Sequence, residues 1–421
     1  MGTSLGMTRA GLAAGAVLAA VALSACGAAS SGGAGAGSTP ASSPPLGSAS
    51  SSAAAATSSA TSSAPAASGT ATAGSGSSSA APGGGPVPSG FAATSVTFVS
   101  ADEAFVLGTA PCAKAPCTSI LRTLDRGASW RGLPAPVAPL AQPADVAGPA
   151  VWGIRFANPS DGFVFGNGLW ETTDGGEHWS SAPSPGGSIE SLEVIDDQVL
   201  AVVSPCSPNG GCAQQGELER RPLAGGGWQT VTKVSGNSAI ATQARVAALI
   251  DGDAVIVTGN GGVSVTTRSG PCSTPGILAP EAIAVTGPDS LAVLCAGNGA
   301  AGSVDKTVFV SDDLGAHWTT AGSPARGGDP EGLASATTSQ LVASAASGAS
   351  MLYYSADGGS QWTTAFSRGD GGLGFNDLGF TTTSDGVVVY GPVMSDDNAE
   401  GRPGQLLLTS NGGASWQAVS Y

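Results

Sequence analysis

An eight-residue pattern, Thr-x-Asp-x-Gly-x-x-Trp, recurs along this sequence and limits what the chain can fold into. Its best copy is TTDGGEHW, which runs from Thr172 to Trp179. The other copies, two of them degenerate, begin in chain order at Thr123, Arg221, Thr266, Ser311, Ser355 and Thr409. Successive copies start 49, 49, 45, 45, 44 and 54 residues apart. Seven copies at a near-constant spacing of this size predict a repeat architecture in which each copy marks one structural unit.

The residue types in the pattern are typical of a tight turn between two strands. The carboxylate accepts hydrogen bonds from nearby backbone N–H groups, the Ser or Thr hydroxyl adds another local bond, and the glycine adopts a positive φ angle. The tryptophan opens the next strand and packs between neighbouring sheets. We therefore assign a structural role to the best-preserved turn residues, which are Asp125, Asp174, Asp313, Asp357, Asn411, Trp130, Trp179, Trp318, Trp362 and Trp416.

These residues resemble the Asp-box (BNR) repeat of sialidases, sortilin-type receptors and photosystem II assembly factors. Four copies match the pattern fully, and the resemblance covers residues 91–421. It implies an all-β fold, a single seven-bladed β-propeller of four-stranded antiparallel blades. It also implies that the Asp boxes are structural turns on the outer rim, remote from the binding face.

The strand pattern agrees with this fold. In the second repeat, residues 151–158 alternate between apolar and polar, 160–162 form a Ser-Asp-Gly turn, and two further strands are expected at 163–166 and 169–173. Repeats one, five and seven contain the same succession. Short alternating segments bounded by Gly, Asp and Pro predict β-strands in a closed all-β structure. No segment after the N-terminal 26 residues shows helical periodicity.

A four-stranded meander determines which connections share a face. If the strands are counted from axis to rim, the first and third connections of each blade, including the Asp boxes, lie together. The long connections lie on the opposite face, which we predict to be the binding face because long loops on a rigid scaffold commonly carry function. Its predicted residues are Asp145, Trp152, Arg155, Asp329, Glu331, Asp370 and Asp377. For Trp152 both ligand stacking and packing between blades remain open.

We expect four of these residues to be exposed at the axial mouth of the propeller: Arg155, Asp329, Glu331 and Asp377. Exposed substitutions seldom change stability. Alanine variants at these positions are therefore expected to stay within about 1 kcal/mol of the wild-type stability and yet to lose ligand binding or turnover.

The N-terminal segment predicts export and lipid anchoring. Arg9 is followed by an apolar stretch from Ala10 to Ala22, as in a signal peptide. Leu23 to Cys26 reads Leu-Ser-Ala-Cys, which matches the bacterial lipobox and implies a lipidated Cys26 after cleavage of residues 1–25. Residues 26–90, rich in Ser, Ala, Gly and Pro, predict a disordered tether with a reach of about 45 Å.

The remaining cysteines are even in number, which is consistent with an oxidising compartment. Two pairs each flank a short loop at a similar place in the repeat, and the last pair would join the fourth repeat turn to the following blade. The predicted disulfides are Cys112–Cys117, Cys206–Cys212 and Cys272–Cys295.

Several classes of chemistry lack the residues they need. The only histidines, His178 and His317, each precede a repeat tryptophan, so neither is expected to activate a nucleophile or bind a metal. The sialidase Phe-Arg-Ile-Pro string is missing. The run from Asp396 to Glu400 lacks the EF-hand spacing and glycine, and we predict no metal and no cofactor. A net charge of −15 argues against nucleic acid, which requires clustered Lys and Arg.

Two functions remain. The first is a monomeric, non-catalytic binding or assembly module, lipid-anchored on the extracytoplasmic face of the bacterial cell membrane, whose partner is a cell-envelope protein or glycan. The alternative is a glycoside hydrolase that uses two central carboxylates, as the resemblance to xyloglucan-degrading Asp-box enzymes suggests. Those enzymes form a cleft from two propellers, whereas this chain has one. The candidate catalytic residues are Asp329, Glu331 and Asp377.

Overall fold

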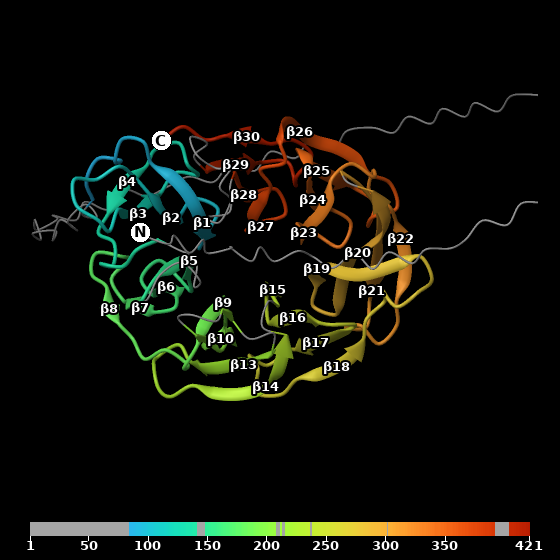
Figure 1. The fold of residues 1–421 in the computed structure, drawn as a ribbon, viewed down its shortest axis with the longest axis horizontal. Coiled ribbons are helices and arrows are strands. Elements are labelled where there is room, and N and C mark those ends of the chain that lie inside the picture. The colour runs from blue at the N-terminus through green and yellow to red at the C-terminus, as the bar shows by residue number, and fades with distance from the viewer. Residues whose placement is uncertain are drawn as a thin grey trace, which may run out of the picture. The chain divides into compact units, whose positions relative to one another are not determined.

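The computed structural model describes residues 84–140, 148–207, 211–212, 215–235, 238–300, 302–391 and 404–421. All of them belong to one compact unit. Within that unit, seven four-stranded antiparallel sheets stand around a central axis, as Figure 1 shows. The predicted seven-bladed β-propeller is therefore confirmed.

Each blade is a meander of consecutive strands. Blade one contains β1 (Ala92–Phe98), β2 (Ala104–Thr109), β3 (Thr118–Thr123) and β4 (Arg131–Leu133), and blade two contains β5 (Val151–Phe156), β6 (Gly162–Gly166), β7 (Leu169–Thr172) and β8 (Ser180–Ser181). Blade three contains β9 (Ser188–Ile195), β10 (Gln198–Ser204), β13 (Gln215–Pro222) and β14 (Gln229–Ser235), with a small hairpin of β11 (Cys206–Ser207) and β12 (Gly211–Cys212) between its second and third strands.

The remaining blades follow the same order. Blade four contains β15 (Ile240–Gln243), β16 (Val246–Asp251), β17 (Ala254–Thr258) and β18 (Thr266–Ser269), and blade five contains β19 (Ile277–Gly287), β20 (Ser290–Ala300), β21 (Ser303–Ser311) and β22 (Thr319–Gly322). Blade six contains β23 (Asp329–Ser335), β24 (Leu341–Ala346), β25 (Gly348–Ser355) and β26 (Thr363–Gly371), and blade seven contains β27 (Phe375–Phe380), β28 (Gly386–Tyr390), β29 (Gln405–Thr409) and β30 (Gln417–Ala418).

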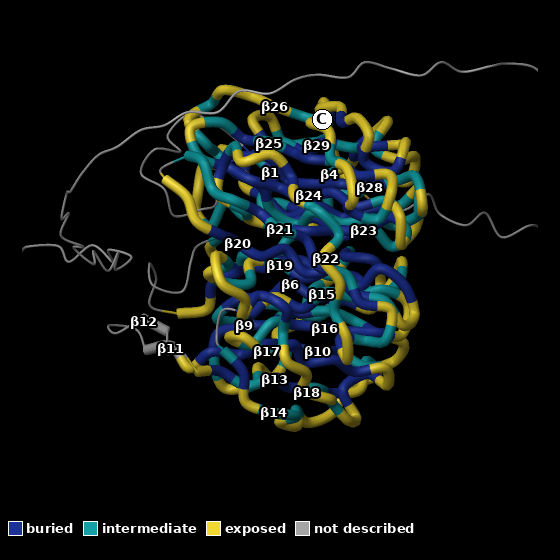
Figure 2. Tube along the Cα trace, turned by 90° about the vertical axis from the view of Figure 1, so that its right-hand side faces the viewer, coloured by how far each residue is buried: buried dark blue, intermediate teal, exposed yellow. Residues whose placement is uncertain are grey.

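The core lies between the faces of adjacent blades. The second strand of a blade is covered on both faces, and β2, β6, β24 and β28 are accordingly buried at nearly every position. Their sequences are continuous apolar runs, as expected for strands buried on both sides. Each fully buried Leu, Val or Phe contributes about 1.5–3 kcal/mol to folding. Figure 2 shows the buried residues in the interior of the unit and the exposed ones at its turns and outer strands.

The repeat turn, meaning the connection from the third to the fourth strand of a blade, has the predicted hydrogen bonds. In blade two, Thr172 Oγ1 accepts a bond of 3.0 Å from the Gly176 N–H, and Asp174 Oδ1 accepts one of 2.9 Å from the His178 N–H. The Gly175 N–H donates to the Ser160 carbonyl in the turn between the first two strands. The two kinds of turn thus share a face, as predicted.

The tryptophan that follows the repeat turn connects neighbouring blades. The indole N–H of Trp179 donates to the Pro134 carbonyl, just after the outer strand of blade one, at 3.1 Å. Trp228 donates in the same way to the Pro183 carbonyl of blade two, at 2.9 Å. The side chain of Trp179 also packs against the core cluster shared by blades one and two. The predicted packing role of this tryptophan is therefore confirmed at Trp179.

The fourth repeat turn is not where the sequence pattern placed it. The segment from Thr266 forms β18, the outer strand of blade four. The turn lies earlier, where Thr258 Oγ1 accepts a bond of 3.1 Å from the Gly262 N–H and Asn260 Oδ1 accepts one of 3.0 Å from the Ser264 N–H. The tryptophan position of this copy is occupied by Val265. The predicted copy kept only Thr266 and Gly270 of the pattern, and it was wrong because the even repeat spacing was given more weight than the Thr-x-Asn-x-Gly residues that form the turn.

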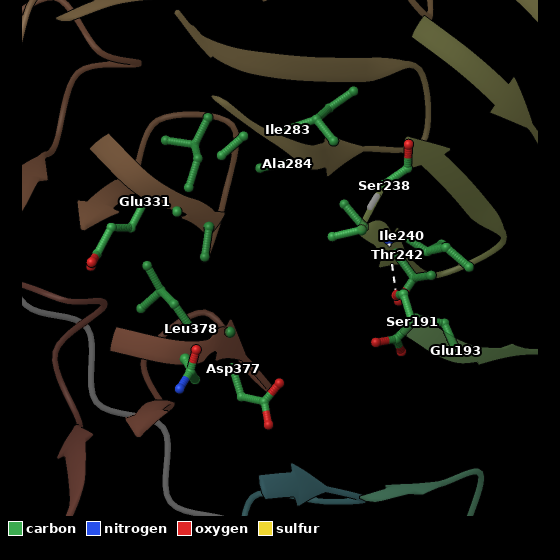
Figure 3. Close-up of a pocket in the computed structure, with 18 of the residues that line it drawn as sticks. Ser191, Glu193, Ser238, Ile240, Thr242, Ile283, Ala284, Glu331, Asp377 and Leu378 are labelled. Carbon is green, nitrogen blue, oxygen red and sulfur yellow. Dashed lines mark hydrogen bonds between the residues drawn. The ribbon is translucent and has the colours of Figure 1, made fainter. Parts of the chain in front are cut away.

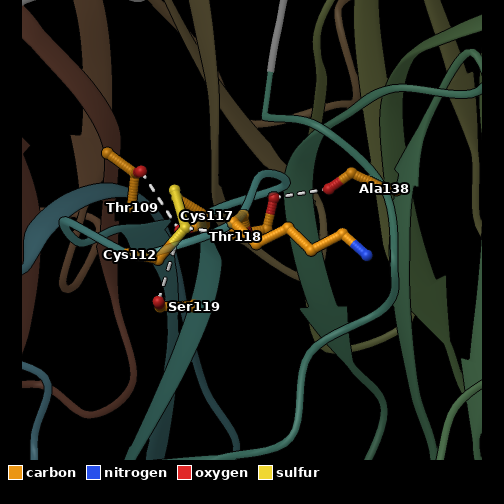
Figure 4. Close-up of a disulfide and its surroundings, with 7 residues drawn as sticks. Thr109, Cys112, Cys117, Thr118, Ser119 and Ala138 are labelled. Atoms are coloured by element: carbon orange, nitrogen blue, oxygen red, sulfur yellow. Dashed lines mark hydrogen bonds between the residues drawn. A yellow bond between two sulfur atoms is a disulfide. The ribbon is translucent and has the colours of Figure 1, made fainter.

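Two of the three predicted disulfides lie within the described side chains, and both are present. Cys112–Cys117 closes the connection between β2 and β3, as Figure 4 shows, with 5.5 Å between the Cα atoms. Cys272–Cys295 joins the segment after β18 to β20 in the next blade, so it starts beyond the fourth repeat turn and not within it. For the third pair, the backbones of Cys206 and Cys212 are opposite each other in the β11–β12 hairpin, and their side chains lie outside the described residues.

Blade seven meets blade one without exchanging a strand. The aromatic ring of Tyr421 packs 5.1 Å from that of Phe91 and 5.7 Å from that of Trp130. Gly85 pairs with Gly132 at the outer edge of blade one through bonds of 2.8 and 2.9 Å. Ordered contacts with the propeller therefore begin before residue 91, where the sequence placed the domain boundary.

Candidate functional site

The innermost strands of the blades surround a central cavity of about 1050 Å³. Its wall is formed mainly by the first strand of each blade, together with Ser238, Ala239 and the β16–β17 turn. Figure 3 shows Glu331, Asp377 and Leu378 on one side of this pocket and Ser238, Thr242 and Glu193 on the other. Among the described residues, six carboxylates and one cation line it, namely Glu190, Glu193, Asp253, Glu281, Glu331, Asp377 and Arg155.

The single cation is held by residues from three other blades. Arg155, on β5, donates from Nε to Glu193 Oε1 on β9 and from Nη2 to Asp377 Oδ1 on β27, both at 2.8 Å. Its Nη1 lies 3.3 Å from the Val96 carbonyl of β1. We call Arg155, Glu193, Asp377 and Ser95 the Arg155 clasp, because these four side chains link the first strands of blades one, two, three and seven.

Asp377 has hydrogen-bond donors on both carboxylate oxygens. The Ser95 hydroxyl donates to Oδ2 at 2.6 Å, and the Val96 N–H donates to the same oxygen at 2.9 Å. Burial raises the pKa of Asp377, but the charge of Arg155 and these hydrogen bonds outweigh burial, so the pKa lies below its usual value. Burial keeps the pKa of Glu193 above its usual value in spite of Arg155. The clasp therefore holds an ionised Asp377.

The exposure predicted for two of these residues is wrong. Only 20% of the Arg155 side chain and 18% of the Asp377 side chain are exposed. The sequence could not show this, because the two residues are far apart in the chain and meet only when the ring closes. By contrast, Asp329 and Glu331, at the start of β23, are exposed as predicted.

Glu331 differs from the clasp carboxylates because it has no ion pair with any residue in the described part of the chain. Its Oε2 accepts a hydrogen bond of 3.2 Å from the Phe375 N–H. Although part of the Glu331 side chain is exposed, desolvation of its carboxylate within the cavity, and then the negative charges of Asp329 and Asp370, raise its pKa to about 7. The pKa of Glu281 is also raised, by burial and by Asp329. No cation in the described part of the wall pairs with Glu281 or Glu331, so a bound cationic ligand would favour their ionised forms and lower their pKa values.

The other predicted residues of the binding face are dispersed. Trp152 lines the cavity, whereas Asp329 and Asp370 are not part of its wall. Asp370 is at the end of β26, where it accepts hydrogen bonds from the Tyr390 hydroxyl and, at 2.7 Å, from the Gly372 N–H. Asp145 lies outside the described residues.

Four wall carboxylates were not predicted, namely Glu190, Glu193, Asp253 and Glu281. The three glutamates are each on the first strand of a blade, as Glu331 is, and that shared position is the signal that could have identified them. Asp253 lies in the turn between β16 and β17, where no such signal marks it.

The histidines lie in the repeat turns, where His178 Nδ1 is 2.7 Å from Asp174 Oδ2 and His317 Nδ1 is 2.6 Å from Asp313 Oδ2. Among the described residues, no three His, Cys, Asp or Glu side chains are grouped so that they could hold a metal ion. Within the same residues we find no helix with the length and apolarity needed to cross a membrane.

No family model and no curated protein matches this sequence. Solved structures share its fold. A structure of YCF48 bound to a D1 peptide has a TM-score of 0.52 at 16% identity and covers 77% of this chain and 95% of that one. YCF48 from Cyanidioschyzon merolae has a TM-score of 0.51 at 15% identity and covers 78% and 98%. An ancestral GH74 enzyme scores 0.48 at 15% identity and covers 80% and 46%. At these identities the similarity shows the fold alone.

Proposed function

We propose that this chain is a bacterial cell-surface lipoprotein whose propeller is a non-catalytic binding module. It acts as a monomer and takes an extended, positively charged segment of a cell-envelope protein into the central cavity. The charge of the cavity wall carries this proposal. Six carboxylates face one arginine, and two of the six already neutralise that arginine.

A cavity lined by one sign of charge attracts ligands of the opposite sign, because its low-dielectric walls focus the field. Lysine or arginine side chains would supply a cation for Glu281 and Glu331, with which no cation in the described part of the wall is paired. A peptide in a propeller of this fold has a precedent in the YCF48 structure with its D1 peptide, although the similarity extends to the fold only. The anchoring part of the proposal depends on the lipobox ending at Cys26, which lies outside the described residues.

The test uses the full chain in detergent and a fluorescently labelled peptide of alternating lysine and serine. We expect saturable binding that weakens several-fold between about 50 and 500 mM salt, because salt screens exposed charges. The double variant Glu281→Gln/Glu331→Gln should bind at least about tenfold more weakly, the effect of about 1.4 kcal/mol.

The matched control is Asp289→Asn/Asp312→Asn, which removes the same charge from the turn face of blade five. It should bind as the wild type does. An alternating glutamate and serine peptide should not bind. If the lysine peptide fails to bind, or if both double variants weaken it equally, the cavity is not a site for cations. If the peptide binds as expected, pull-down from envelope extracts is the next step to identify the natural partner.

One observation favours the second function, a glycoside hydrolase. Glu331 and Asp370 interact electrostatically, and the pKa of Glu331 is raised to about 7 while that of Asp370 is lowered. Two carboxylates with diverging pKa values are the arrangement of a general acid and its partner. Against this function, Asp377 is engaged by Arg155, and Asp370 is bonded to Tyr390. Release of reducing sugar from envelope polysaccharides, abolished by Glu331→Gln, would establish the hydrolase.

A further inference from the structure

The ammonium group of Lys306 is surrounded by backbone carbonyls. Lys306 is on β21 of blade five and is 1% exposed, whereas the other two lysines, Lys114 and Lys233, are exposed. Its Nζ lies 2.9–3.1 Å from four carbonyl oxygens, those of Val304, Ala325, Arg326 and Gly327. Three of the four carbonyls belong to the connection between β22 and β23.

This connection, residues 323–328, carries the chain from the rim of blade five to the axis. It is held against blade five by the Val304 N–H, which donates to the Arg326 carbonyl at 2.9 Å, and by the Gly328 N–H, which donates to the Gly302 carbonyl at 3.1 Å. The Tyr353 hydroxyl, from blade six, donates to the Gly327 carbonyl at 2.8 Å. The residue that follows is Asp329, the first of β23.

The connection passes so close to Met351 of blade six that there is no room for side chains at its two glycines. A Cβ atom on Gly327 would lie 2.9 Å from Met351 Sδ, and one on Gly328 would lie 2.8 Å from Met351 Cε. The carbonyl oxygens of Ala325, Arg326 and Gly327 lie in the interior, and buried carbonyls need a hydrogen-bond donor. An ammonium group has three N–H donors and a positive charge, which makes its hydrogen bonds to carbonyls stronger than neutral ones.

We propose that Lys306 is a positioning residue for the central cavity: its buried ammonium fixes the 323–328 connection, and thereby places Asp329 and Glu331 where they attract a cationic ligand. This inference rests on the proposed function of the cavity. The charged groups around the ammonium are Asp329, Asp305 and Arg326. Asp329 links Lys306 to the acidic cavity wall, because it interacts electrostatically with Lys306 and with Glu331.

The direction of the change in affinity separates positioning from a plain charge effect. Lys306→Met removes a positive charge close to an acidic cavity. If charge alone mattered, the lysine–serine peptide would bind the variant more tightly, since a repelling cation is gone. If Lys306 positions the acidic residues, the peptide binds more weakly in spite of the more negative cavity. Lys233→Met, which removes the same charge from the exposed outer strand of blade three, is the matched control.

The test has two measurements on the full chain in detergent. Hydrogen–deuterium exchange of the Val304 and Gly328 amides is expected to be at least about tenfold faster in Lys306→Met, and unchanged in Lys233→Met. The affinity for the lysine–serine peptide is expected to fall at least about threefold in the first variant only. Tyr353→Phe, which removes one donor to the Gly327 carbonyl, should give a smaller change of both kinds and serves if Lys306→Met does not fold.

Unchanged exchange at both amides in a folded Lys306→Met or Tyr353→Phe overturns the anchoring role. Faster exchange with equal or tighter peptide binding overturns the positioning role. If wild-type protein does not bind the peptide, the proposed function fails, while the exchange measurement still decides whether Lys306 anchors the connection.

Discussion

Replacing Arg155 with alanine should destabilise the propeller strongly, although the residue lines a cavity. The substitution removes two ion pairs of 2.8 Å and leaves Glu193 and Asp377 facing each other without a cation. The side chains of all three residues are at most 20% exposed, so water replaces the lost partner poorly. Removing one partner of a buried ion pair costs about 3–5 kcal/mol.

The lower part of that range is the better expectation. Asp377 keeps its hydrogen bonds from Ser95 and Val96 after the substitution, and the cavity admits some water. We therefore expect Arg155→Ala to lose about 3 kcal/mol of unfolding free energy. Because the clasp joins blade seven to blades one, two and three, the loss should also appear as faster hydrogen exchange in β1 and β27.

Urea denaturation at pH 7, followed by tryptophan fluorescence, measures the change. Arg126→Ala is the matched control, because Arg126 pairs with Asp102 at 2.7 Å but is 60% exposed. Exposed pairs contribute about 0–1 kcal/mol. If Arg155→Ala loses no more stability than Arg126→Ala does, the clasp does not hold the ring together and the reasoning is refuted.

Four further results are expected. The pKa of Glu331 is raised to about 7 in the folded protein, so the stability of the protein should fall as the pH rises from the unfolded pKa of this residue to 7. Solvent screening limits this decline to about 1 kcal/mol. Glu331→Gln should abolish it, and an unchanged pH profile in this variant would contradict the assignment. Trp179→Ala should cost about 2–4 kcal/mol in the same urea assay without weakening the lysine–serine peptide, and weaker binding at full stability would place the ligand on the turn face. Replacing Cys272 and Cys295 with alanine should cost about 3 kcal/mol, since their bridge closes a segment of 23 residues, and non-reducing peptide mapping should find no free thiol in the wild type. Cys26→Ser should abolish acylation and shift the protein to the aqueous phase in detergent partitioning; a membrane-bound, acylated variant would disprove the lipid anchor.

The fold could be predicted because its determinants are local. The repeat turn depends on residues within four positions of each other, as Thr172 and Gly176 show, so a pattern search detects it directly. The same reasoning failed for the fourth copy because Val265 replaces the tryptophan there, although the Thr258 and Asn260 side chains make the full set of local bonds. The side chain that packs between blades can therefore change while the turn persists.

The site could be predicted only in part because its determinants are long-range. The position of Glu331 on the first strand of its blade indicated that it faces the axis. No local pattern indicates that Arg155 meets Asp377, 222 positions later. Lys306 is a similar case, because its partners are carbonyls of a connection whose path depends on Met351 and Tyr353. Residues that link blades become visible only when the ring is assembled.

Among the described residues, blades seven and one share no strand, so the strand pairing does not require any particular blade to come first in the chain. Each sheet is made from one continuous segment, and Tyr421 packs against Phe91. A circular permutant that joins these neighbouring ends and opens the chain between β8 and β9 would keep all seven sheets intact. Any blade could then come first, provided that the Arg155 clasp and the tryptophan contacts between blades still form once the chain begins and ends at a different blade.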